Sequence, residues 1–367
     1  MTKEPLAKDA PIEADYKPKQ KAGKPKYQAI PEDYPNPTFI EKKLQFLSVV
    51  LWLWMFIFFL VVVPFTFVYC FINIPWSRYL IVGYYGWMWY DRKGPINGRA
   101  IPWIRDFVRY SPIWTPFKAY FPGKLIKTCD LDPNEKYIIG YHPHGVYAIA
   151  LFANVVFNSA IATVFPGIDI IMNTLPANFW IPIWRDYILS LGSGSCESKS
   201  IKRRLLNGKP GTAMIIALGG AEEFKHMTEG TLDLVLLKRK GFAKIALATG
   251  SHLVPVIGFG ENELFHRITH PAFQPLHNFF KAVLKSAAPL FIGRFGIAIP
   301  KRVPLYTVGK FGLNIVGRPI PVKRVDHPTE EQIDELHQKY VKAIQDLYDE
   351  FKDEFHTNRT QELRFVA

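Results

Sequence analysis

The chain has 367 residues, 49% of them hydrophobic, and a formal net charge of +13, so it can bury one substantial core with further segments attached. Its three cysteines, Cys70, Cys129 and Cys196, have no paired spacing, which argues against a disulfide framework or a Cys-based metal site and favours a reducing compartment. The positive charge suits an anionic membrane surface or a polyphosphorylated ligand, and we expect no nucleic-acid partner because no zinc-finger spacing, arginine-rich arm or recognition helix accompanies it.

The first 40 residues alternate Lys, Pro, Ala and acidic residues and contain seven prolines, with hardly any apolar periodicity. Such a composition cannot bury enough apolar surface to fold, so residues 1–40 are predicted to be a disordered cytosolic leader. The leader lacks the Arg and Ser bias of a transit peptide, and too many polar residues precede the apolar stretch for a secretory signal.

Residues 44–77 contain no charged side chain across 34 positions, which is rare for a buried helix of a soluble protein. We therefore expect residues 41–90 to be embedded in a membrane. A straight helix over the uncharged stretch would extend about 51 Å, well beyond the ~30 Å hydrocarbon core, and Pro64 divides it. Basic residues on both flanks favour a hairpin that enters and returns over one span followed by an interfacial segment.

Residues 91–367 are predicted to form the catalytic domain. Short apolar runs predict strands at 137–140, 168–172, 212–218 and 253–259, and helices are expected at 146–157 and 241–249. Because the two kinds of element alternate, the sequence predicts an α/β fold with a mixed, largely parallel sheet flanked by helices. Residues 329–355 place apolar side chains at steps of three and four, which is typical of an amphipathic helix docked on the domain.

Two histidines stand where the first predicted strand ends, in His142-Pro143-His144-Gly145. Ligands of α/β sheets bind at the carboxyl ends of strands, and here Pro143 constrains the backbone while Gly145 allows its close approach to a ligand. A His with a pKa near ~6.5 can take a proton from an alcohol while a thioester carbonyl is attacked. The alternatives are a helix-capping His beside a core His, or a zinc pair that lacks a third ligand at sensible spacing.

A glycine-rich block with two acids, Gly219-Gly220-Ala221-Glu222-Glu223, ends the strand predicted at 212–218. Either carboxylate can orient an imidazole, and the glycines can offer backbone N–H groups to an oxyanion. A tight turn in which the two acids cap the following helix explains the same residues equally well.

Two basic segments are candidates for binding the phosphates of coenzyme A. The loop Leu191-Gly192-Ser193-Gly194-Ser195-Cys196 lacks the second Gly of a serine-hydrolase turn, and the basic helix expected after it carries Lys199, Lys202, Arg203 and Arg204, of which Lys199 and Arg203 are the chosen candidates. Arg239 and Lys240 precede the helix at 241–249 and are suited to a phosphate or a lipid headgroup. An ordinary solvated basic face explains the first segment equally well.

Several motifs, in order along the chain, carry a resemblance to a known family. They are Tyr120-Phe121-Pro122, Gly140-Tyr141-His142-Pro143-His144-Gly145, Gly219-Gly220-Ala221 with Glu223, Arg239-Lys240-Gly241-Phe242, Leu253-Val254-Pro255-Val256, Phe259-Gly260-Glu261-Asn262-Glu263-Leu264, Gly317-Arg318-Pro319-Ile320 and His327-Pro328-Thr329. Together they resemble the type 2 diacylglycerol acyltransferase family, which also contains monoacylglycerol acyltransferases and wax-ester synthases.

The resemblance implies a glycerolipid-acyltransferase-like fold and an enzyme on the cytosolic face of the endoplasmic reticulum membrane that also reaches lipid droplets. It implies acyl-CoA and diacylglycerol as substrates, no cofactor and no metal, and it leaves homo-oligomerisation open. Broader glycerolipid acyltransferases use His-x-x-x-x-Asp, but here Tyr147 and Ile149 stand five residues after His142 and His144. The carboxylate must come from elsewhere, and Glu223 falls where the family's glutamate does.

The mechanism that we expect from this resemblance is direct acyl transfer to diacylglycerol, without an acyl-enzyme, which makes triacylglycerol. His144, or else His142, removes the proton from the acceptor hydroxyl, and Glu223 steadies the imidazolium. Backbone N–H groups near Gly219 and Gly220 receive the oxyanion. Monoacylglycerol or a long-chain alcohol is the alternative acceptor, and a membrane-anchored lipid-binding protein without turnover is the alternative class.

Overall fold

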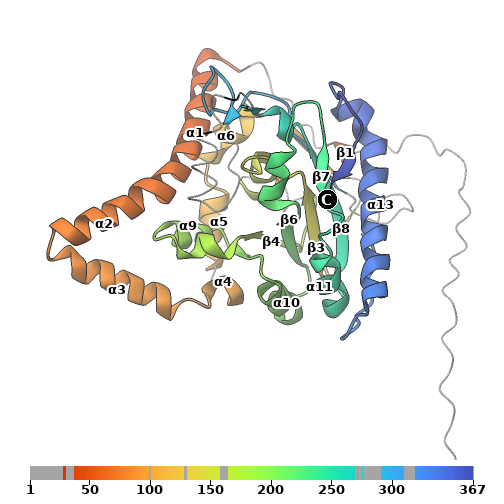
Figure 1. The fold of residues 1–367 in the computed structure, drawn as a ribbon, viewed down its shortest axis with the longest axis horizontal. Coiled ribbons are helices and arrows are strands. Elements are labelled where there is room, and N and C mark those ends of the chain that lie inside the picture. The colour runs from red at the N-terminus through yellow and green to blue at the C-terminus, as the bar shows by residue number, and fades with distance from the viewer. Residues whose placement is uncertain are drawn as a thin grey trace, which may run out of the picture.

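The protein is built on an eight-stranded sheet with the strand order β1-β2-β11-β8-β3-β6-β4-β5 (Figure 1). The computed structural model describes residues 28–29, 37–98, 101–127, 130–157, 164–268, 271, 275, 291–309 and 319–366. The strands of the sheet are β1 (Gln28–Ala29), β2 (Lys124–Lys127), β3 (Tyr137–His142), β4 (Asp169–Thr174), β5 (Gly194–Ser195), β6 (Thr212–Ala217), β8 (His252–Phe259) and β11 (Tyr306–Gly309).

Parallel pairing dominates this sheet. The strands β8, β3, β6, β4 and β5 are parallel neighbours, whereas β11 is antiparallel to β8 and β1 is antiparallel to β2. Every residue of β3 is buried, as expected for a central parallel strand with both faces covered. The predicted mixed, largely parallel α/β sheet is therefore confirmed, and each of the four predicted strands exists with ends shifted by one or two residues.

Helices cover both faces of the sheet. One face packs against α10 (Ser198–Asn207), α11 (Gly241–Thr249) and α13 (Glu330–Phe355), and the other against α1 (Phe39–Ile57), α6 (Trp114–Tyr120) and α7 (Ile149–Leu151). Further helical segments are α4 (Gly94–Asn97), α5 (Pro102–Arg109), η3 (Pro176–Trp180), α9 (Trp184–Ser190), η4 (Gly220–Lys225) and η5 (Glu261–Glu263). Among the described residues, four short strands lie outside the main sheet: β7 (Asp233–Val235), β9 (His266–Arg267), β10 (Phe291–Ile292) and β12 (Arg364–Val366).

The helix predicted over residues 146–157 is shorter and begins later than expected. Gly145 and Ala148 both have positive φ, at 57° and 53°, and an α-helix cannot contain such residues in its first turn. The α-helical part is therefore limited to α7 and continues as a π-helical turn, η2 (Phe152–Val156). As a result, the backbone N–H groups that follow the two histidines point to partners outside the helix.

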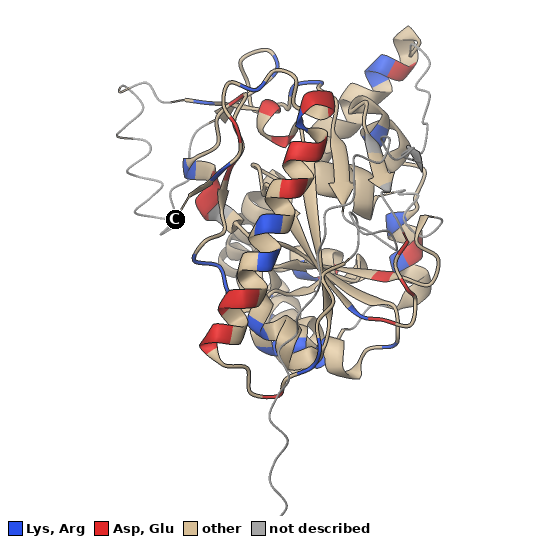
Figure 2. Ribbon diagram, turned by 90° about the vertical axis from the view of Figure 1, so that its right-hand side faces the viewer, with Lys and Arg blue, Asp and Glu red and all other residues tan. Residues whose placement is uncertain are grey.

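The last helix, α13, agrees with its prediction. Thr329 caps it in a capping box with Gln332, and the apolar stripe, which includes Leu336, Tyr340 and Ile344, is buried on the sheet. Its exposed positions are mostly charged, and Figure 2 shows acidic residues toward both ends of the helix with basic residues between them.

The apolar N-terminal region forms a helical hairpin whose bend lies later than predicted. The helix runs without a break from α1 through the π-helical turn η1 (Phe58–Val62) into α2 (Val63–Asn73), because Pro64 occupies the first turn of α2, where a missing N–H is tolerated. The chain reverses at residues 74–76, which contain Pro75, and α3 (Ser77–Tyr90) returns toward the body (Figure 1). Pro64 therefore does not divide the stretch.

By length and composition, Phe39–Asn73 is the one helix among the described residues that is apolar enough to cross a membrane. Only 22% of its most apolar part is buried in the protein, so it is not an ordinary core helix. Its inner face nevertheless belongs to the α/β core, because the Trp52 ring lies 5.1 Å from Phe117 and 5.5 Å from Phe152. The hairpin is thus attached to the domain through α1, and its embedding in a membrane over residues 41–90 stays a prediction.

The predicted leader lies almost entirely outside the described residues. Of residues 1–36 the structure describes Gln28–Ala29, which pair with β2 as a short strand.

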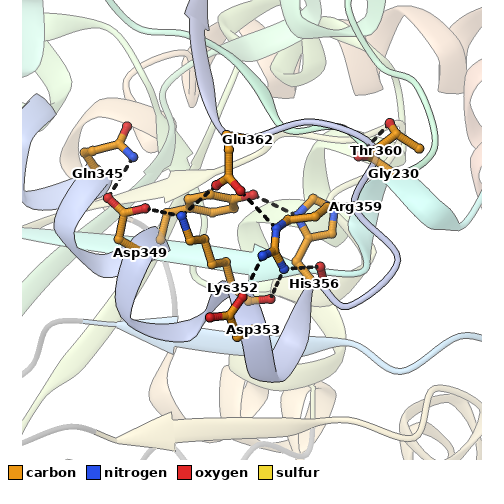
Figure 3. A network of polar contacts seen from close by, with 10 residues as sticks. Gly230, Gln345, Asp349, Lys352, Asp353, His356, Arg359, Thr360 and Glu362 are labelled. Carbon is orange, nitrogen blue, oxygen red and sulfur yellow. Dashed lines mark hydrogen bonds and ion pairs between the residues drawn. The ribbon is translucent and has the colours of Figure 1, made fainter.

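The C-terminal segment is tied to the end of α13 and to β7. Figure 3 shows Lys352 between Asp349 and Glu362, at 2.7 Å from each, and Arg359 bound to Asp353 and Glu362. Beyond this network, β12 (Arg364–Val366) pairs in parallel with β7. The segment therefore braces the strand that follows η4.

Replacing Ile344, which is fully buried between α13 and the sheet, tests this packing. We expect I344A to lower the free energy of unfolding by about 2–5 kcal/mol, because it removes buried methyl groups and leaves a cavity. Q338A, on the exposed face of the same helix, is the matched control and is expected to change stability little. Thermal unfolding of the detergent-solubilised protein measures both, and equal midpoints would contradict the packing.

Candidate active site

The two histidines lie at the carboxyl edge of the sheet, between two buried glutamates. His142 is the last residue of β3, and the neighbouring strands β6 and β8 end beside it. Each neighbour is followed by a short 3-10 turn that carries a glutamate, Glu223 in η4 and Glu261 in η5. The strand order β8-β3-β6 therefore places one carboxyl group on either side of the turn at residues 142–145.

Glu223 holds this turn through its backbone. Its Oε2 accepts a hydrogen bond of 2.7 Å from the backbone N–H of His144, and its Oε1 accepts one of 3.1 Å from Val235 in β7. The carboxyl group is buried, and burial raises its pKa to about 7, although both N–H groups oppose the rise. The carboxylate therefore connects the histidine turn to the strand that the C-terminal segment braces.

Glu261 holds the other end of the same segment. Its two carboxylate oxygens accept the backbone N–H groups of Ile149 and Ala150, at 2.9 and 2.7 Å. These N–H groups have no partner within the helix because they belong to the first turn of α7. Burial raises the pKa of Glu261 to about 7 as well.

Two glycines are required by these glutamates. A Cβ at Gly219 would lie 1.9 Å from Cδ of Glu223, and a Cβ at Gly145 would lie 2.3 Å from Cγ of Glu261. Gly145 also has a φ of 57°, which side chains disfavour. Both positions therefore exclude any larger residue while the glutamates keep their places.

The His144 ring is oriented with one nitrogen available. Its Nδ1 lies 3.0 Å from the carbonyl oxygen of Gly145, and a carbonyl only accepts, so Nδ1 carries the proton and Nε2 keeps its lone pair. The side chain is half-buried, with its ring 5.3 Å from that of Phe224. Burial lowers the pKa of His144, which keeps the imidazole neutral at pH 7.

His142 is enclosed and neutral. Its Nε2 lies 3.1 Å from the hydroxyl of Tyr340, which in turn donates to the carbonyl oxygen of Gly140. Nε2 therefore carries the proton, and Nδ1 has no partner among the described residues. Complete burial lowers the pKa of His142 to about 3, so this ring is poorly suited to accept a second proton and become an imidazolium.

Comparison with known proteins identifies the family of the chain. A family model described as "Diacylglycerol acyltransferase" matches residues 68–366. The chain is 39% identical over 342 residues to diacylglycerol O-acyltransferase 2A of Umbelopsis ramanniana, which covers 89% of this chain and 91% of that protein. It is 39% identical over 337 residues to 2-acylglycerol O-acyltransferase 1 of Bos taurus, with 89% and 96% covered. No solved structure matches.

The chain belongs to the diacylglycerol acyltransferase family. A further relative, diacylglycerol O-acyltransferase 2 of Dictyostelium discoideum, is 36% identical over 304 residues and covers 80% of this chain and 88% of that protein. The resemblance noted from the motifs is thereby confirmed.

The structure brings together the histidines, Glu223, Pro143, Gly145 and Gly219, but in a different relation from the predicted one. The contacts of Glu223 are with the His144 backbone and Val235, not with an imidazole, because the turn presents its N–H to the carboxylate. Gly220 has a φ of 58° and open space around it. Catalytic and oxyanion-binding roles for these residues stay predictions.

The four predicted phosphate ligands are not gathered at the histidines. Arg239 donates to Glu222 at 2.8 Å, and its charge opposes the rise in the pKa of Glu223. Lys240 instead pairs with Asp334 of α13. Lys199 and Arg203 are exposed on α10, and no hydrogen bond or ion pair joins them to either histidine in the part of the chain that is described.

From the sequence, Glu261 was named only as part of a family motif, without a role, and Tyr340 was not singled out. The signal for Glu261 was its place directly after a strand, as for Glu223; nothing in the sequence indicated that Tyr340 would reach β3 from α13. Within the described residues no group of three or more His, Cys, Asp or Glu side chains is arranged to hold a metal ion.

A series of aromatic rings connects His144 to the hairpin. Successive ring centroids lie 5.3 to 6.2 Å apart, and the series ends on helix α1. Its members are His144, Phe224, Phe291, Phe265, Tyr147 and Phe56. The half-buried imidazole is thus joined to helix α1 through packed aromatic side chains, of which Phe265 is fully buried.

The raised pKa values of Glu223 and Glu261 predict a pH-dependent stability. Their native pKa near 7 lies above the ordinary value of 4.5, so the folded state binds these protons more tightly than the unfolded state. The resulting stability is complete below about pH 4.5 and is lost as the pH rises through 7, by about 3 kcal/mol for each group. The lowered pKa values of His142 and His144 act in the opposite direction below pH 6.5, so the comparison between proteins is the test. Between pH 5 and 7 we expect the melting midpoint of the wild type to fall relative to the midpoints of E223Q and E261Q. Equal slopes in all three proteins would contradict the assignment.

Proposed function

We propose that the protein is an acyl-CoA:diacylglycerol O-acyltransferase that makes triacylglycerol. The observation that carries this proposal is the neutral His144, whose Nδ1 is held by a carbonyl and whose Nε2 is left as a base at the carboxyl edge of the sheet. Membership of a family named for this reaction supplies the substrates. A general base within reach of a hydroxyl is the group that attack on a thioester requires.

The proposed reaction is a direct transfer. Nε2 of His144 takes the proton of the free hydroxyl of diacylglycerol as its oxygen bonds to the thioester carbon. The tetrahedral intermediate then expels the thiolate of coenzyme A, which receives the proton from the imidazolium, so triacylglycerol and coenzyme A leave and the ring is neutral again. A base of this kind contributes about 10²–10⁴ in rate.

In this proposal the two glutamates act as positioning residues. Glu223 and Glu261 fix the backbone on both sides of His144, so the ring does not need to be ordered when the substrate arrives. Backbone N–H groups near Gly219 and Gly220 remain the proposed donors to the oxyanion. The hydrogen bonds of Tyr340 with His142 and with the carbonyl oxygen of Gly140 hold the end of β3 before the turn.

A second acceptor has specific support. The bovine relative is named 2-acylglycerol O-acyltransferase, and its identity to this chain equals that of the fungal diacylglycerol acyltransferase, at 39%. Monoacylglycerol is therefore the second candidate acceptor at the same site, and the same base would activate its hydroxyl.

We further propose that the hairpin embeds the enzyme in the endoplasmic reticulum membrane, with the site on the cytosolic face, and that the enzyme also reaches lipid droplets. The support is the apolar helix Phe39–Asn73 and the aromatic series that leads from it to His144. Diacylglycerol is too apolar to arrive through water, so delivery from the bilayer suits this arrangement. A glycerolipid-acyltransferase-like fold, acyl-CoA as donor and the absence of a metal or cofactor belong to the same proposal.

Purified protein incubated with labelled oleoyl-CoA and each acceptor in turn tests the proposal. We expect H144A to lose transfer by about 10²-fold or more, because the base is removed, while H327A, at an exposed histidine, retains it. Diacylglycerol is expected to be the preferred acceptor, followed by monoacylglycerol.

Two outcomes would overturn this proposal. Full transfer by H144A would show that His144 is not the base. Lipid binding without any labelled product in the wild-type protein would indicate a lipid-binding protein without turnover.

A further inference from the structure

A second cluster of buried polar groups lies at the β4–β5 end of the sheet, away from the histidines. The loop before β5 runs between two arginines, Arg109 of α5 and Arg204 of α10. Nε of Arg109 donates to the carbonyl oxygen of Leu191 at 2.8 Å, and Nη2 of Arg204 lies 3.4 Å from that of Ser193. A loop of three residues thus separates two guanidinium groups.

Both guanidinium groups are buried without a bonded carboxylate. Arg109 is 7% exposed and Arg204 is 8% exposed, and neither forms an ion pair among the described residues. Asp169 favours the charge of both, but its Oδ1 bonds Arg105 at 2.8 Å and its side chain is half exposed. Burial lowers the pKa of each arginine to about 10, which reflects the cost of a buried charge that lacks a counter-ion.

Hydrogen-bond donors in the same cluster have no partner. The Nε–H of Arg204 and the hydroxyl of Ser193 are buried, and neither finds an acceptor in the part of the chain that the structure describes. Oδ1 of Asn173 is also without a donor. This oxygen lies near Arg204, because an ideal Cβ at Gly194 would be 3.1 Å from it and 2.9 Å from Nη1 of Arg204. Buried polar atoms are nearly always bonded, so the Nε–H of Arg204 and the hydroxyl of Ser193 call for an acceptor, and an acceptor of negative charge would also balance the guanidinium group.

The loop is shaped to let the backbone approach the arginines. A Cβ at Gly194 would lie 2.9 Å from Nη1 of Arg204, and a Cβ at Gly192, whose φ is 76°, would lie 2.8 Å from Cδ of Arg105 and 3.3 Å from Nη2 of Arg109. Glycines that admit backbone next to paired guanidinium groups are typical of anion-binding loops.

We propose that Arg204 and Ser193, with Arg109 behind the loop, bind a phosphate group, and that this phosphate belongs to the coenzyme A part of the acyl donor. The inference rests on the proposed function, because it assigns a second contact to the same substrate.

The position of the cluster fits the remote end of that donor. Ser193 precedes Gly194 of β5, which is three strands from β3 and pairs with Asn173; in register Asn173 is level with Gly140, two residues before His142. With strands ~4.8 Å apart and ~3.3 Å per residue, this corresponds to roughly 16 Å between the two sites. A group at that distance cannot touch the reacting thioester, whereas the phosphates of coenzyme A are separated from the thioester by the long pantetheine arm.

The proposal assigns phosphate binding to the buried face of α10 and not to the exposed face that the sequence had suggested. Lys199 and Arg203 point to solvent from the same helix, where a phosphate contact would be weak and screened by salt. Arg204 lies on the side of α10 that faces the loop, where a charge-assisted bond is stronger.

Two donors that share the thioester and the pantetheine arm test the site. Oleoyl-CoA carries the 3′-phospho-ADP group with all of its phosphates and S-oleoyl-pantetheine carries none of it, so we compare the KM of each in wild type, R204Q and S193A, with R324Q at an exposed arginine as the matched control. We expect R204Q to raise the KM for oleoyl-CoA about 10-fold or more, and S193A several-fold, because charge-assisted bonds to phosphate are lost. The KM for S-oleoyl-pantetheine and for diacylglycerol is expected to stay unchanged, as it is for both donors in R324Q.

An equal loss with both donors in R204Q and in S193A would show that these side chains only hold the loop, and would overturn the site. Failure of the wild-type protein to transfer from either donor would instead contradict the proposed function, and binding then decides the site separately. Coenzyme A is expected to raise the melting midpoint of wild type but not of R204Q. Stabilisation by inorganic phosphate or phosphatidate vesicles alone, without an effect of coenzyme A, would overturn the assignment to the donor.

Discussion

Two buried carboxyl groups that bind backbone N–H groups determine the geometry of this site. Glu223 accepts from His144, and Glu261 accepts from Ile149 and Ala150, so the segment between the two histidines and α7 is fixed at both ends. A buried carboxyl group is costly unless its oxygens are bonded, and these N–H groups would also be unpaired without it. The carboxyl groups and the backbone N–H groups therefore stabilise each other. The glycines at positions 145 and 219 leave the room that the two glutamate side chains occupy.

The same protein face joins this site to the membrane-suited hairpin. Helix α1 contributes Trp52 to the α/β core while its other side chains stay exposed, and aromatic rings continue from Phe56 to His144. The cluster around Arg204 lies at the β4–β5 end of the sheet, beside the residues that follow α3, because an ideal Cβ at Gly98 would lie 3.2 Å from Nη2 of Arg204. The hairpin, the base and the proposed phosphate contact are therefore parts of one connected region, which suits a reaction between a lipid and a water-soluble thioester.

Apolar periodicity and capping residues within single elements predicted the fold well. They did not predict the contacts between elements that are far apart in the sequence. The strands around His142, helix α11 and the 26-residue α13 follow from apolar periodicity and capping residues. The late start of α7 depends on the positive φ of Ala148, and the unbroken helix through Pro64 depends on a π-helical turn, for which the sequence has no clear sign. Glu223 was found from its motif, but its partner was not, because a carboxylate beside a turn bonds whichever donor the folded backbone presents.

The pH dependence of kcat/KM for oleoyl-CoA in wild type and E223Q tests the role of Glu223 most directly. If Glu223 holds the backbone of His144, the acid limb caused by the imidazole lies below pH 6.5 and at the same pH in both proteins, whereas any step caused by Glu223 itself, near pH 7, is absent from E223Q. If the carboxylate instead stabilises the imidazolium, its removal lowers the pKa of His144. An acid limb displaced by a full pH unit or more in E223Q would therefore contradict the account.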